Sequence, residues 1–407
     1  MSQLSFRTEF HSSELQQLEL PVEVRKPNMA LVTRTLSTET VDVPPGTYHI
    51  VATLPAGVEL YERAEVVADK ATVVVLRPDP ADVSPSESLE VQRYFVGTPV
   101  ASTLPMAAAL GLESLGPSED TATLRILAGN PLAGDRLVGQ LTMGDPGTLL
   151  APQPPPERGI ARFVCWSGTG RFVQLLQRGQ PPLNLALPIS PDVGCTLDIV
   201  RQLTGPLAPE LHLPNVGADS TLRYYERGLL DQVRTAIGAI SFERLLQQKM
   251  ADPIAAAVGA YMLLRLGELD RLHDWTRNLA NMFPWLPDGL ALWGEHQARL
   301  GRHAEALTSF LQLPDRGLPI FSDGLSYTVD RLRLYSRFPI AGQPPESAGR
   351  APDLLARLQQ FADSVDFRKP ILTFTGLDPS RPDDELLDPS APASSELDGL
   401  DVLQHMG

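Results

Sequence analysis

The sequence predicts an α+β multidomain protein in which antiparallel β-sandwich-like regions precede an array of α-helices and a disordered acidic tail. Before about residue 210, apolar residues alternate with polar ones, as in half-buried strands. The phrase Arg-Leu-Gly then closes two helix-like runs, at Gly267 and Gly301, which are 34 residues apart. Between Leu377 and Asp401 the chain holds eight carboxylates and one arginine, a composition typical of disorder. With 407 residues, the chain exceeds a single compact core.

Residues 1–80 are predicted to form the first β-sandwich-like domain. After the turn residues Pro44-Pro45-Gly46, four apolar side chains share one face of a strand: Tyr48, Ile50, Ala52 and Leu54. The phrase VDVPPGTYHIVATLPAG resembles the strand-turn-strand core of PEGA or carboxypeptidase-regulatory modules, in which Pro-Gly-X-Tyr opens an edge hairpin. This resemblance implies a binding or spacer module without catalytic residues.

A second β-rich domain is predicted over residues 91–210. The segment from Arg77 to Glu90 is rich in Pro, Ser and Asp and has no apolar period, so it is expected to be a linker. The strict alternation of leucines and isoleucine between Leu183 and Ile189 predicts a half-buried strand. Whether the two β regions form one domain stays open.

Helices are predicted over residues 219–338. Asp219-Ser220 and Asp252-Pro253 are start signals, because Asp caps a helix and Pro is tolerated at its first position. The helix from Pro253 ends at Gly267, and a partner is expected from Glu268. In the next unit Asp288 is expected to cap the first helix, and Gly301 turns the chain. A helix from Asp323 to Phe338 is expected to cover the last apolar face.

The second of these units, GLALWGEHQARLGRHAEALTSFL, resembles a tetratricopeptide repeat. The small and aromatic positions of that family match four residues here: Gly294, Gly301, Ala306 and Phe310. The earlier unit is divergent, with Leu272 and Thr276 where a small and an aromatic residue are expected. The segment from Asp252 to Tyr335 also resembles C-terminal regions of bacterial proteins associated with caspase-like or other conflict-system proteases. That resemblance implies a role in regulated proteolysis, as an accessory subunit or a substrate.

Composition argues against several functions. The net charge of −15 and the absence of a basic stripe argue against nucleic-acid binding. No apolar stretch is long enough for a membrane span, and the start of the sequence lacks the pattern of a secretory signal, so a cytoplasmic location is expected. The seven histidines are dispersed, and two cysteines, Cys165 and Cys195, suit buried thiols. No catalytic residue, cofactor site or metal site is predicted.

Interaction residues are therefore sought on surfaces. Trp285, in a proline-flanked loop near Arg277, is a candidate docking point, because Trp and Arg are frequent hot spots. Arg331 and Arg333 mark a partly basic helix face, for which simple solvation is the competing interpretation. Near the end, Leu397, Leu400 and Leu403 recur every three residues, which indicates either a short motif that inserts into a partner's groove or chance in a disordered tail.

Three hypotheses follow for the whole chain. The first is a non-enzymatic protein-interaction adaptor or accessory subunit, whose partner is a protein such as a protease. In the second, the chain is an effector precursor that a protease cuts in residues 339–407, near Arg350 or Arg381; this region is read as linker, short helix, strand and acidic flexible tail. The third is an enzyme with an unrecognised site in residues 91–210.

Overall fold

The computed structural model describes most of the folded elements of the chain. It describes residues 2–10, 18–28, 30–54, 59–68, 70–77, 122–133, 138–139, 150–155, 159–165, 170–202, 206–228, 239–338, 340, 345–376 and 400–406. Contacts divide the chain into two units: Met1–Gly116 with Asn215–Phe242, and Pro117–Pro214 with Glu243–Gly407. The expected linker between Arg77 and Glu90 lies almost wholly outside the described residues, and the four domain boundaries stay predictions.

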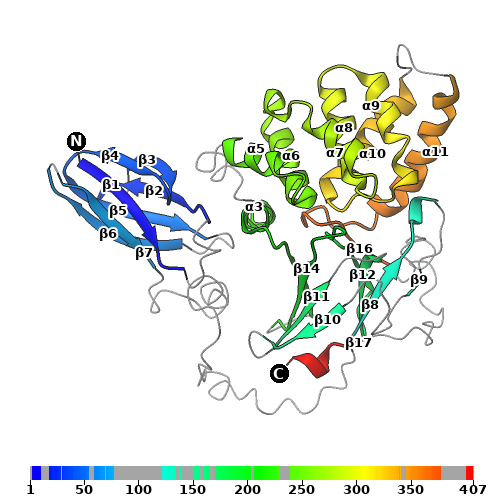
Figure 1. Ribbon diagram of the computed structural model, residues 1–407. Coiled ribbons are helices and arrows are strands. Elements are labelled where there is room, and N and C mark those ends of the chain that lie inside the picture. The colour runs from blue at the N-terminus through cyan, green and yellow to red at the C-terminus, as the bar shows by residue number, and fades with distance from the viewer. Residues whose placement is uncertain are drawn as a thin grey trace. The chain divides into compact units, whose positions relative to one another are not determined.

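The first unit contains two β-sheets. One has the strand order β4-β1-β7, with bounds Thr40–Val43, Ser2–Thr8 and Thr72–Leu76. The other has the order β3-β2-β5-β6, with bounds Leu31–Leu36, Pro21–Arg25, Gly46–Thr53 and Glu59–Val66 (Figure 1). All pairings in these sheets are antiparallel except that between β1 and β7, which is parallel. The predicted β class is therefore confirmed, with one parallel pair added.

The phrase around Tyr48 forms the centre of the second sheet. Tyr48, Ile50, Ala52 and Leu54 are all buried in one hydrophobic core, as their alternation predicted. The Tyr48 hydroxyl donates to the Pro44 carbonyl oxygen at 2.8 Å, which fixes the turn that opens β5. Strand β5 pairs with both β2 and β6, so it is an interior strand, and together with the last strand of the sheet, β6, it forms an antiparallel hairpin.

A helix from the middle of the sequence packs on this first sandwich. Helix α3 spans Val216–Glu226 and is capped by Asn215, whose Oδ1 accepts from the Ala218 N–H at 3.0 Å. The predicted cap at Asp219 is therefore four residues late. Val216 packs on the core of the first unit, and the Tyr224 hydroxyl donates to the Thr53 carbonyl oxygen.

The second unit contains another β-sandwich. One sheet has the order β10-β11-β14-β15, with bounds Leu150–Gln153, Ile160–Cys165, Cys195–Val200 and Ala208–His212. The facing sheet has the order β16-β13-β12-β8-β17, with bounds Thr373–Thr375, Leu183–Ala186, Gly170–Gln177, Ala122–Ala128 and Leu400–Asp401, and β9 (Val138–Gly139) also pairs with β8. The apolar faces of the two sheets share one core, which includes Ile126, Phe163 and Leu197.

The helices of the second unit form successive hairpins (Figure 1). Their bounds are Ala239–Gln247 for α5, which crosses the boundary between the units, Pro253–Leu266 for α6, Trp275–Met282 for α7, Pro287–Arg299 for α8, His303–Phe310 for α9, Ser322–Arg337 for α10 and Pro345–Ala362 for α11. Gly267 and Gly301 adopt φ of 75° and 77°, the left-handed conformation that ends a helix and that glycine reaches without strain. At the start of α6, Asp252 Oδ1 accepts from the Ala255 N–H at 2.9 Å, so this predicted cap is confirmed.

Two local predictions for the helices are wrong. No regular helix begins at Glu268: a 3₁₀ turn (Leu269–Leu272) and the break at His273, with φ of 44°, precede α7. Asp288 does not cap its own helix, because the N-cap position belongs to Leu286. Its carboxylate instead accepts from the N–H groups of Ile320 and Phe321, 32 and 33 residues later.

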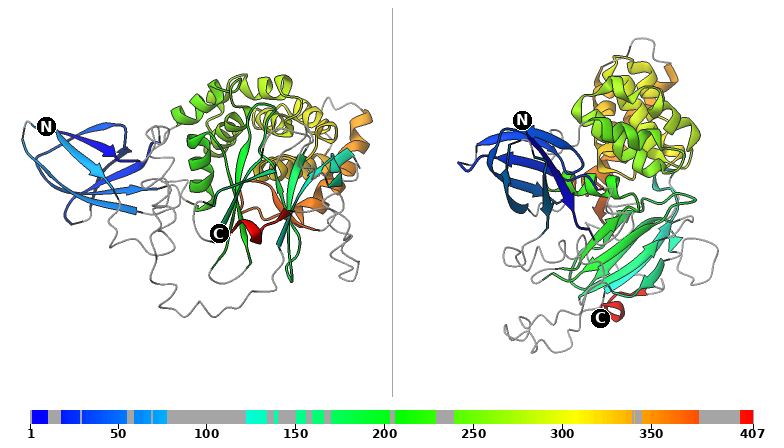
Figure 2. Two further views of the ribbon diagram at one scale, coloured as in Figure 1. Left: turned by 60° about the horizontal axis from the view of Figure 1, so that its bottom comes forward. Right: turned by 60° about the vertical axis from the view of Figure 1, so that its left-hand side comes forward.

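The helices lie over one end of the sandwich in the second unit, as the two views of Figure 2 show. Strand β16 comes after the helices yet pairs with β13, so that Leu183 lies opposite Thr375. The Asn184 side chain donates to the Gly376 carbonyl oxygen at 2.7 Å, and Arg357 in α11 donates to the Leu132 carbonyl oxygen at 2.7 Å. Helices and sandwich are therefore joined by hydrogen bonds from several elements.

Candidate interaction surface

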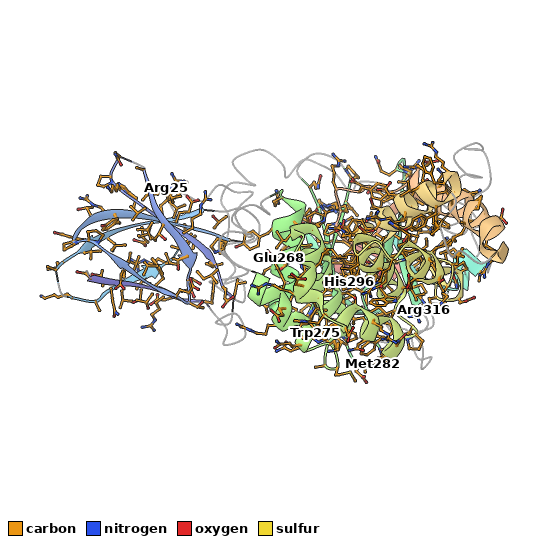
Figure 3. All side chains as sticks on the ribbon, turned by 90° about the horizontal axis from the view of Figure 1, so that it is seen from above. Arg25, Glu268, Trp275, Met282, His296 and Arg316 are labelled. Carbon is orange, nitrogen blue, oxygen red and sulfur yellow. The ribbon has the colours of Figure 1, made fainter. Side chains whose placement is uncertain are left out.

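The short helix α7 presents an apolar and basic surface. The Met282 side chain at its end is 53% exposed, and Met250, after α5, is 69% exposed. The Lys249 ammonium lies 5.3 Å from the centre of the Trp275 ring, within cation–π distance. Arg277 is exposed two residues after Trp275, on the other flank of α7. We name these five residues around the buried side of α7, Lys249, Met250, Trp275, Arg277 and Met282, the α7 surface (Figure 3 labels Trp275 and Met282).

The opposite side of α7 is fixed on α8. Leu279 and Ala280 are buried, and Gly289 in α8 approaches their backbone so closely that a Cβ at that glycine would lie 2.8 Å from the Leu279 carbonyl oxygen. Thr276 is fully buried, and its hydroxyl lies 2.9 Å from Nδ1 of His296. The exposed side chains of α7 therefore project from a backbone that the rest of the unit holds in place.

Charged groups border the α7 surface near the start of α7. The His273 ring packs edge-on against Trp275, with 4.9 Å between ring centres. Nε2 of His273 lies 3.4 Å from the Glu243 carboxylate, which also accepts from Arg271 at 3.4 Å. These exposed pairs orient the Trp275 ring but contribute little free energy of folding, because water screens them.

Trp285, the predicted docking residue, lies in the loop between α7 and α8. Its ring is partly buried and packs edge-on against Phe283, 6.1 Å between centres. Its carbonyl oxygen accepts from Arg171 of β12 at 3.0 Å, and burial lowers the pKa of Arg171. The loop is thus attached to the sandwich beneath it. Trp285 and Arg277 lie on either side of Met282 in sequence.

The predicted basic face of α10 contains two differently placed arginines. The Arg331 guanidinium is partly buried and donates to both carboxylate oxygens of Glu295, at 2.7 and 2.9 Å. Arg333 is exposed and lies 3.4 Å from Asp330 on its own helix. Only Arg333 of this pair therefore presents its charge to solvent. Leu334, 41% exposed, is an apolar neighbour of Arg333 that sequence reasoning missed.

The residues predicted near the C-terminal end are only partly described. Leu397 lies outside the described residues. Leu400 belongs to strand β17, and Leu403 begins a 3₁₀ turn (Leu403–His405) and packs against the sandwich core of its own chain. Of the two predicted cleavage positions, Arg381 also lies outside the described residues. Arg350 is exposed within helix α11 and donates to the Leu311 carbonyl oxygen at 3.1 Å.

The buried acidic residues of the helices are engaged inside the protein. The Asp288 carboxylate is fully buried and accepts from the Tyr261 hydroxyl and the Ile320 N–H, both at 2.7 Å. Burial raises the pKa of Asp288 to about 6, although these hydrogen bonds oppose the rise. Glu295, 2% exposed, accepts from Arg299 and Arg331. These internal partners stabilise the contacts between the helices.

The two cysteine thiols are also buried, as the sequence predicted. Cys165 and Cys195 are unpaired thiols that lie opposite each other on β11 and β14. A hydrogen bond with Cys165, together with burial, raises the pKa of the Cys195 thiol, which disfavours the reactive thiolate. The glycine-rich residues 167–170 lie almost wholly outside the described part of the chain. Within that part, no group of three or more His, Cys, Asp or Glu side chains is placed to hold a metal ion.

No described helix combines the length and the apolar character that crossing a membrane requires. The fold and this surface define an α+β class in which helical hairpins rest on a β-sandwich and a partly apolar helix face is exposed. A protein family described as the Y4kD C-terminal domain matches residues 220–396 of this chain, and these residues contain the α7 surface.

A protein named as a probable protease, from a Desulfuromonadales bacterium, is 37% identical to this chain over 91 residues. The alignment covers 22% of this chain and 11% of the relative's own length. No solved structure matches the chain. The helical region therefore resembles a known family in sequence, whereas no solved structure matches the fold of the chain.

Proposed function

We propose that this chain is a non-enzymatic adaptor or accessory subunit that binds a protein partner through the α7 surface. The observation that carries the proposal is the exposure of Met282 at the end of α7 and of Met250 next to Lys249, whose ammonium packs on the Trp275 ring; the backbone of α7 is fixed from its buried side. Trp275 and Met282, seven residues apart, lie on the same flank of α7, and apolar side chains exposed together are typical of interaction sites.

The chemistry of the α7 surface fits a partner with an apolar centre and an acidic rim. Methionine side chains are flexible and polarisable, so Met250 and Met282 can adapt to another surface. Trp275 contributes a large, oriented ring, and Trp and Arg frequently dominate binding energy. Lys249 and Arg277 add positive charge to a chain whose net charge is −15, and such charges favour an acidic partner.

We further propose that the partner is a protease, in a bacterial defence or signalling system. The support is the 91-residue similarity to a protein named as a probable protease, together with the resemblance to protease-associated regions stated above. We expect the complex in the cytoplasm, where thiols such as those of Cys165 and Cys195 stay reduced. The buried Asp288 and Glu295 support a non-enzymatic role, because their partners are internal.

Site-specific photo-crosslinking tests the proposal in the full chain. We would place a photoreactive amino acid at Met282, irradiate cells of the native host and identify crosslinked peptides by mass spectrometry. We expect peptides of one protease. The matched control carries the same amino acid at Glu305, an exposed position on α9, and is expected to give no such peptide.

Charge reversal then tests whether the α7 surface supplies the affinity. We expect Arg277→Glu to lower recovery of the crosslinked protease by about tenfold, as for one interface hot spot, whereas Glu305→Lys leaves it unchanged. Equal crosslinking from Met282 and Glu305 would contradict the docking surface. Peptide hydrolysis by the purified chain alone would contradict the non-enzymatic role and favour a hidden enzyme site in residues 91–210.

A further inference from the structure

The C-terminal residues of the chain complete the second sandwich. Strand β17 pairs antiparallel with β8, so that Leu400 lies opposite Leu124 and Asp401 opposite Thr123. Strand β16 lies at the other edge of the same sheet and precedes β17 by 24 intervening residues, 376–399. The chain therefore leaves the sheet at one edge and returns at the opposite edge. Local chain continuity does not account for this pairing, so contacts at the β8 edge must hold the segment.

Those contacts are mainly apolar. Val402 is 0% exposed and Met406 is 4% exposed, and both belong to the core that the two sheets share. Leu403 packs on the same core, and the His405 ring lies edge-on to the buried Phe163 ring, 5.7 Å between centres. Release of the segment would therefore expose these apolar side chains, and the core that they cover, to water.

Backbone hydrogen bonds fix the register of the segment. The Val402 N–H donates to the Ala122 carbonyl oxygen at 2.9 Å, which extends the pairing with β8. At the other end, the Met406 carbonyl oxygen accepts from the Gly159 N–H at 3.0 Å. Between them, Asp401 Oδ1 accepts from the Leu403 N–H at 3.0 Å and starts the 3₁₀ turn. Strand addition by backbone bonds, with pockets for chosen side chains, is a common mode of peptide recognition.

We propose that the groove between β8 and β11 is a peptide-docking site for which residues 400–406 are a separable ligand, and that the same segment of a second copy of this chain can occupy it. The argument rests on complementarity that the structure displays: two apolar anchors, Val402 and Met406, and backbone partners at both ends. This site lies on the sandwich and does not depend on the α7 surface or on a protease partner.

Residues 376–399, which join the segment to β16, are its tether. This covalent link decides whether the groove binds the chain's own segment or that of a second copy. A segment joined to its own groove has an effective concentration of the order of 1 mM, so it excludes free peptide at micromolar concentration. Cutting the tether removes this advantage without changing any contact in the groove. Exchange between copies is therefore expected only after the tether is cut or the resident segment is weakened.

A cleavable version of the full chain tests the proposal. A recognition sequence for a site-specific protease is inserted within residues 377–399, and binding of a fluorescent peptide of residues 396–407 is followed by anisotropy. After the cut we expect saturable binding with Kd in the micromolar range, and the uncut chain should bind at least about tenfold more weakly. Gel filtration of the cut chain should show the released fragment leaving on dilution.

Peptide variants establish that the anchors act as proposed. Met406→Asp in the peptide should abolish binding, whereas Gln404→Asp, at an exposed position, should bind like the original. Met406→Asp in the uncut full chain should let the original peptide bind, because the resident segment is weakened. The proposal is overturned if neither the cut chain nor this full-length variant binds the peptide at 1 mM, a concentration matching the tethered segment. It is also overturned if both aspartate peptides bind equally.

Discussion

The hairpins α6–α7 and α8–α9 each turn at a glycine of the same conformation, but the chain after the turn differs between them. Gly267 and Gly301 end their first helices with almost the same φ, 75° and 77°. After Gly301, helix α9 begins at His303. After Gly267 the chain makes a 3₁₀ turn and a positive-φ residue, His273, before α7 begins at Trp275. The glycine therefore fixes the end of a helix, and other residues decide how the chain continues.

The difference arises where the helices cross. In α8–α9 the ring of Phe310 packs directly on Gly294, where a Cβ would lie 2.5 Å from the ring. The residues 34 positions earlier are Ala260 and Thr276. Thr276 carries no ring to fill such a crossing, and its hydroxyl instead lies beside His296 of α8. Helix α7 consequently packs on α8. Side chains at the crossing, and not the turn, select the partner helix.

The arginines of the two Arg-Leu-Gly phrases also serve different contacts. Arg265 donates from Nε to Asp323 at the start of α10, at 2.6 Å. Arg299 donates from Nε to Glu295, one turn earlier, at 2.7 Å, and also reaches the Leu264 carbonyl oxygen at the end of α6. One phrase thus ties the first hairpin to α10, and the other ties the second hairpin to the first.

The largest expected loss of stability follows from changing Glu295, the partner of the arginine in the second Arg-Leu-Gly phrase. Glu295→Gln removes the buried negative charge that pairs with Arg299 and Arg331 and replaces one of its two acceptor oxygens with an NH₂ donor. We expect the free energy of unfolding to fall by about 3 kcal/mol, the lower end for a broken buried pair because both arginines touch solvent. Urea denaturation measures this. The control Glu305→Gln, on the exposed face of α9, should stay within about 0.5 kcal/mol, and an equal loss there would refute the interpretation.

At the start of α8, Asp288 makes the stability of the second hairpin depend on pH. The equivalent position of the first hairpin, 34 residues earlier, is Ile254, which has no titratable group. The folded pKa of Asp288, about 6, exceeds its usual 3.8, so the folded protein holds more protons than the unfolded chain between these values. Stability of the native protein relative to Asp288→Asn should therefore fall as pH rises from 3.8 to 6, by up to about 3 kcal/mol. Denaturation of both proteins across this range tests the sign; a constant difference would contradict it.

The crossing itself can be altered in the second hairpin. Gly294→Ala places a methyl group within the Phe310 ring contact, and we expect a loss of about 2 kcal/mol because both residues are buried. Phe310→Leu in the same protein should recover part of that loss, which thermal unfolding would show. Gly349→Ala in α11 is the matched control: its Cβ would meet nothing within 4 Å, so it should stabilise by about 0.5 kcal/mol. No recovery in the double variant would mean that the contact does not limit the crossing.

The smallest effect should be shared by the two turns. Gly267→Ala and Gly301→Ala both force an alanine into the left-handed region, and neither Cβ would meet a neighbour within 4 Å. Each should cost about 1 kcal/mol, and the two losses should agree within about 0.5 kcal/mol. Chemical denaturation of both variants measures them. Clearly unequal losses would show that the turns are not equivalent.

Structural features that depend only on residues close together in the sequence were predictable. The sequence signals at Asp252-Pro253, Gly267 and Gly301 act over one helical turn, and the structure confirms them. The alternation around Tyr48 similarly indicated its buried face. Helix α7 was misplaced because its start depends on His273 and on packing against α8, which no local pattern reports. The role of Asp288 was missed for the same reason: its partners lie 32 and 33 residues later.

The candidate surface was predictable only in part. Arg277 and the tryptophan-rich loop drew notice by composition, but Met250 and Met282 did not, because an apolar residue near a helix end is ordinarily buried. Met282 follows Leu279 by three residues, a spacing typical of a buried helix face, so periodicity favoured its burial. Similarly, the spacing of Leu400 and Leu403 left open a groove-binding motif or chance, and the sequence could not reveal that this segment pairs with β8 and packs on the core of its own chain.

The sheet that ends in β16 and β17 has a consequence for synthesis. Ribosomes deliver β8, β12 and β13 long before residues 373–401, and domains begin to fold while the chain is still growing. Until those residues emerge, the nascent sandwich presents two open strand edges, which are the sites where chains aggregate or recruit chaperones. This sheet can therefore be completed only after the helical region has been translated. A prematurely terminated product keeps both strand edges exposed, and quality-control factors can recognise such edges.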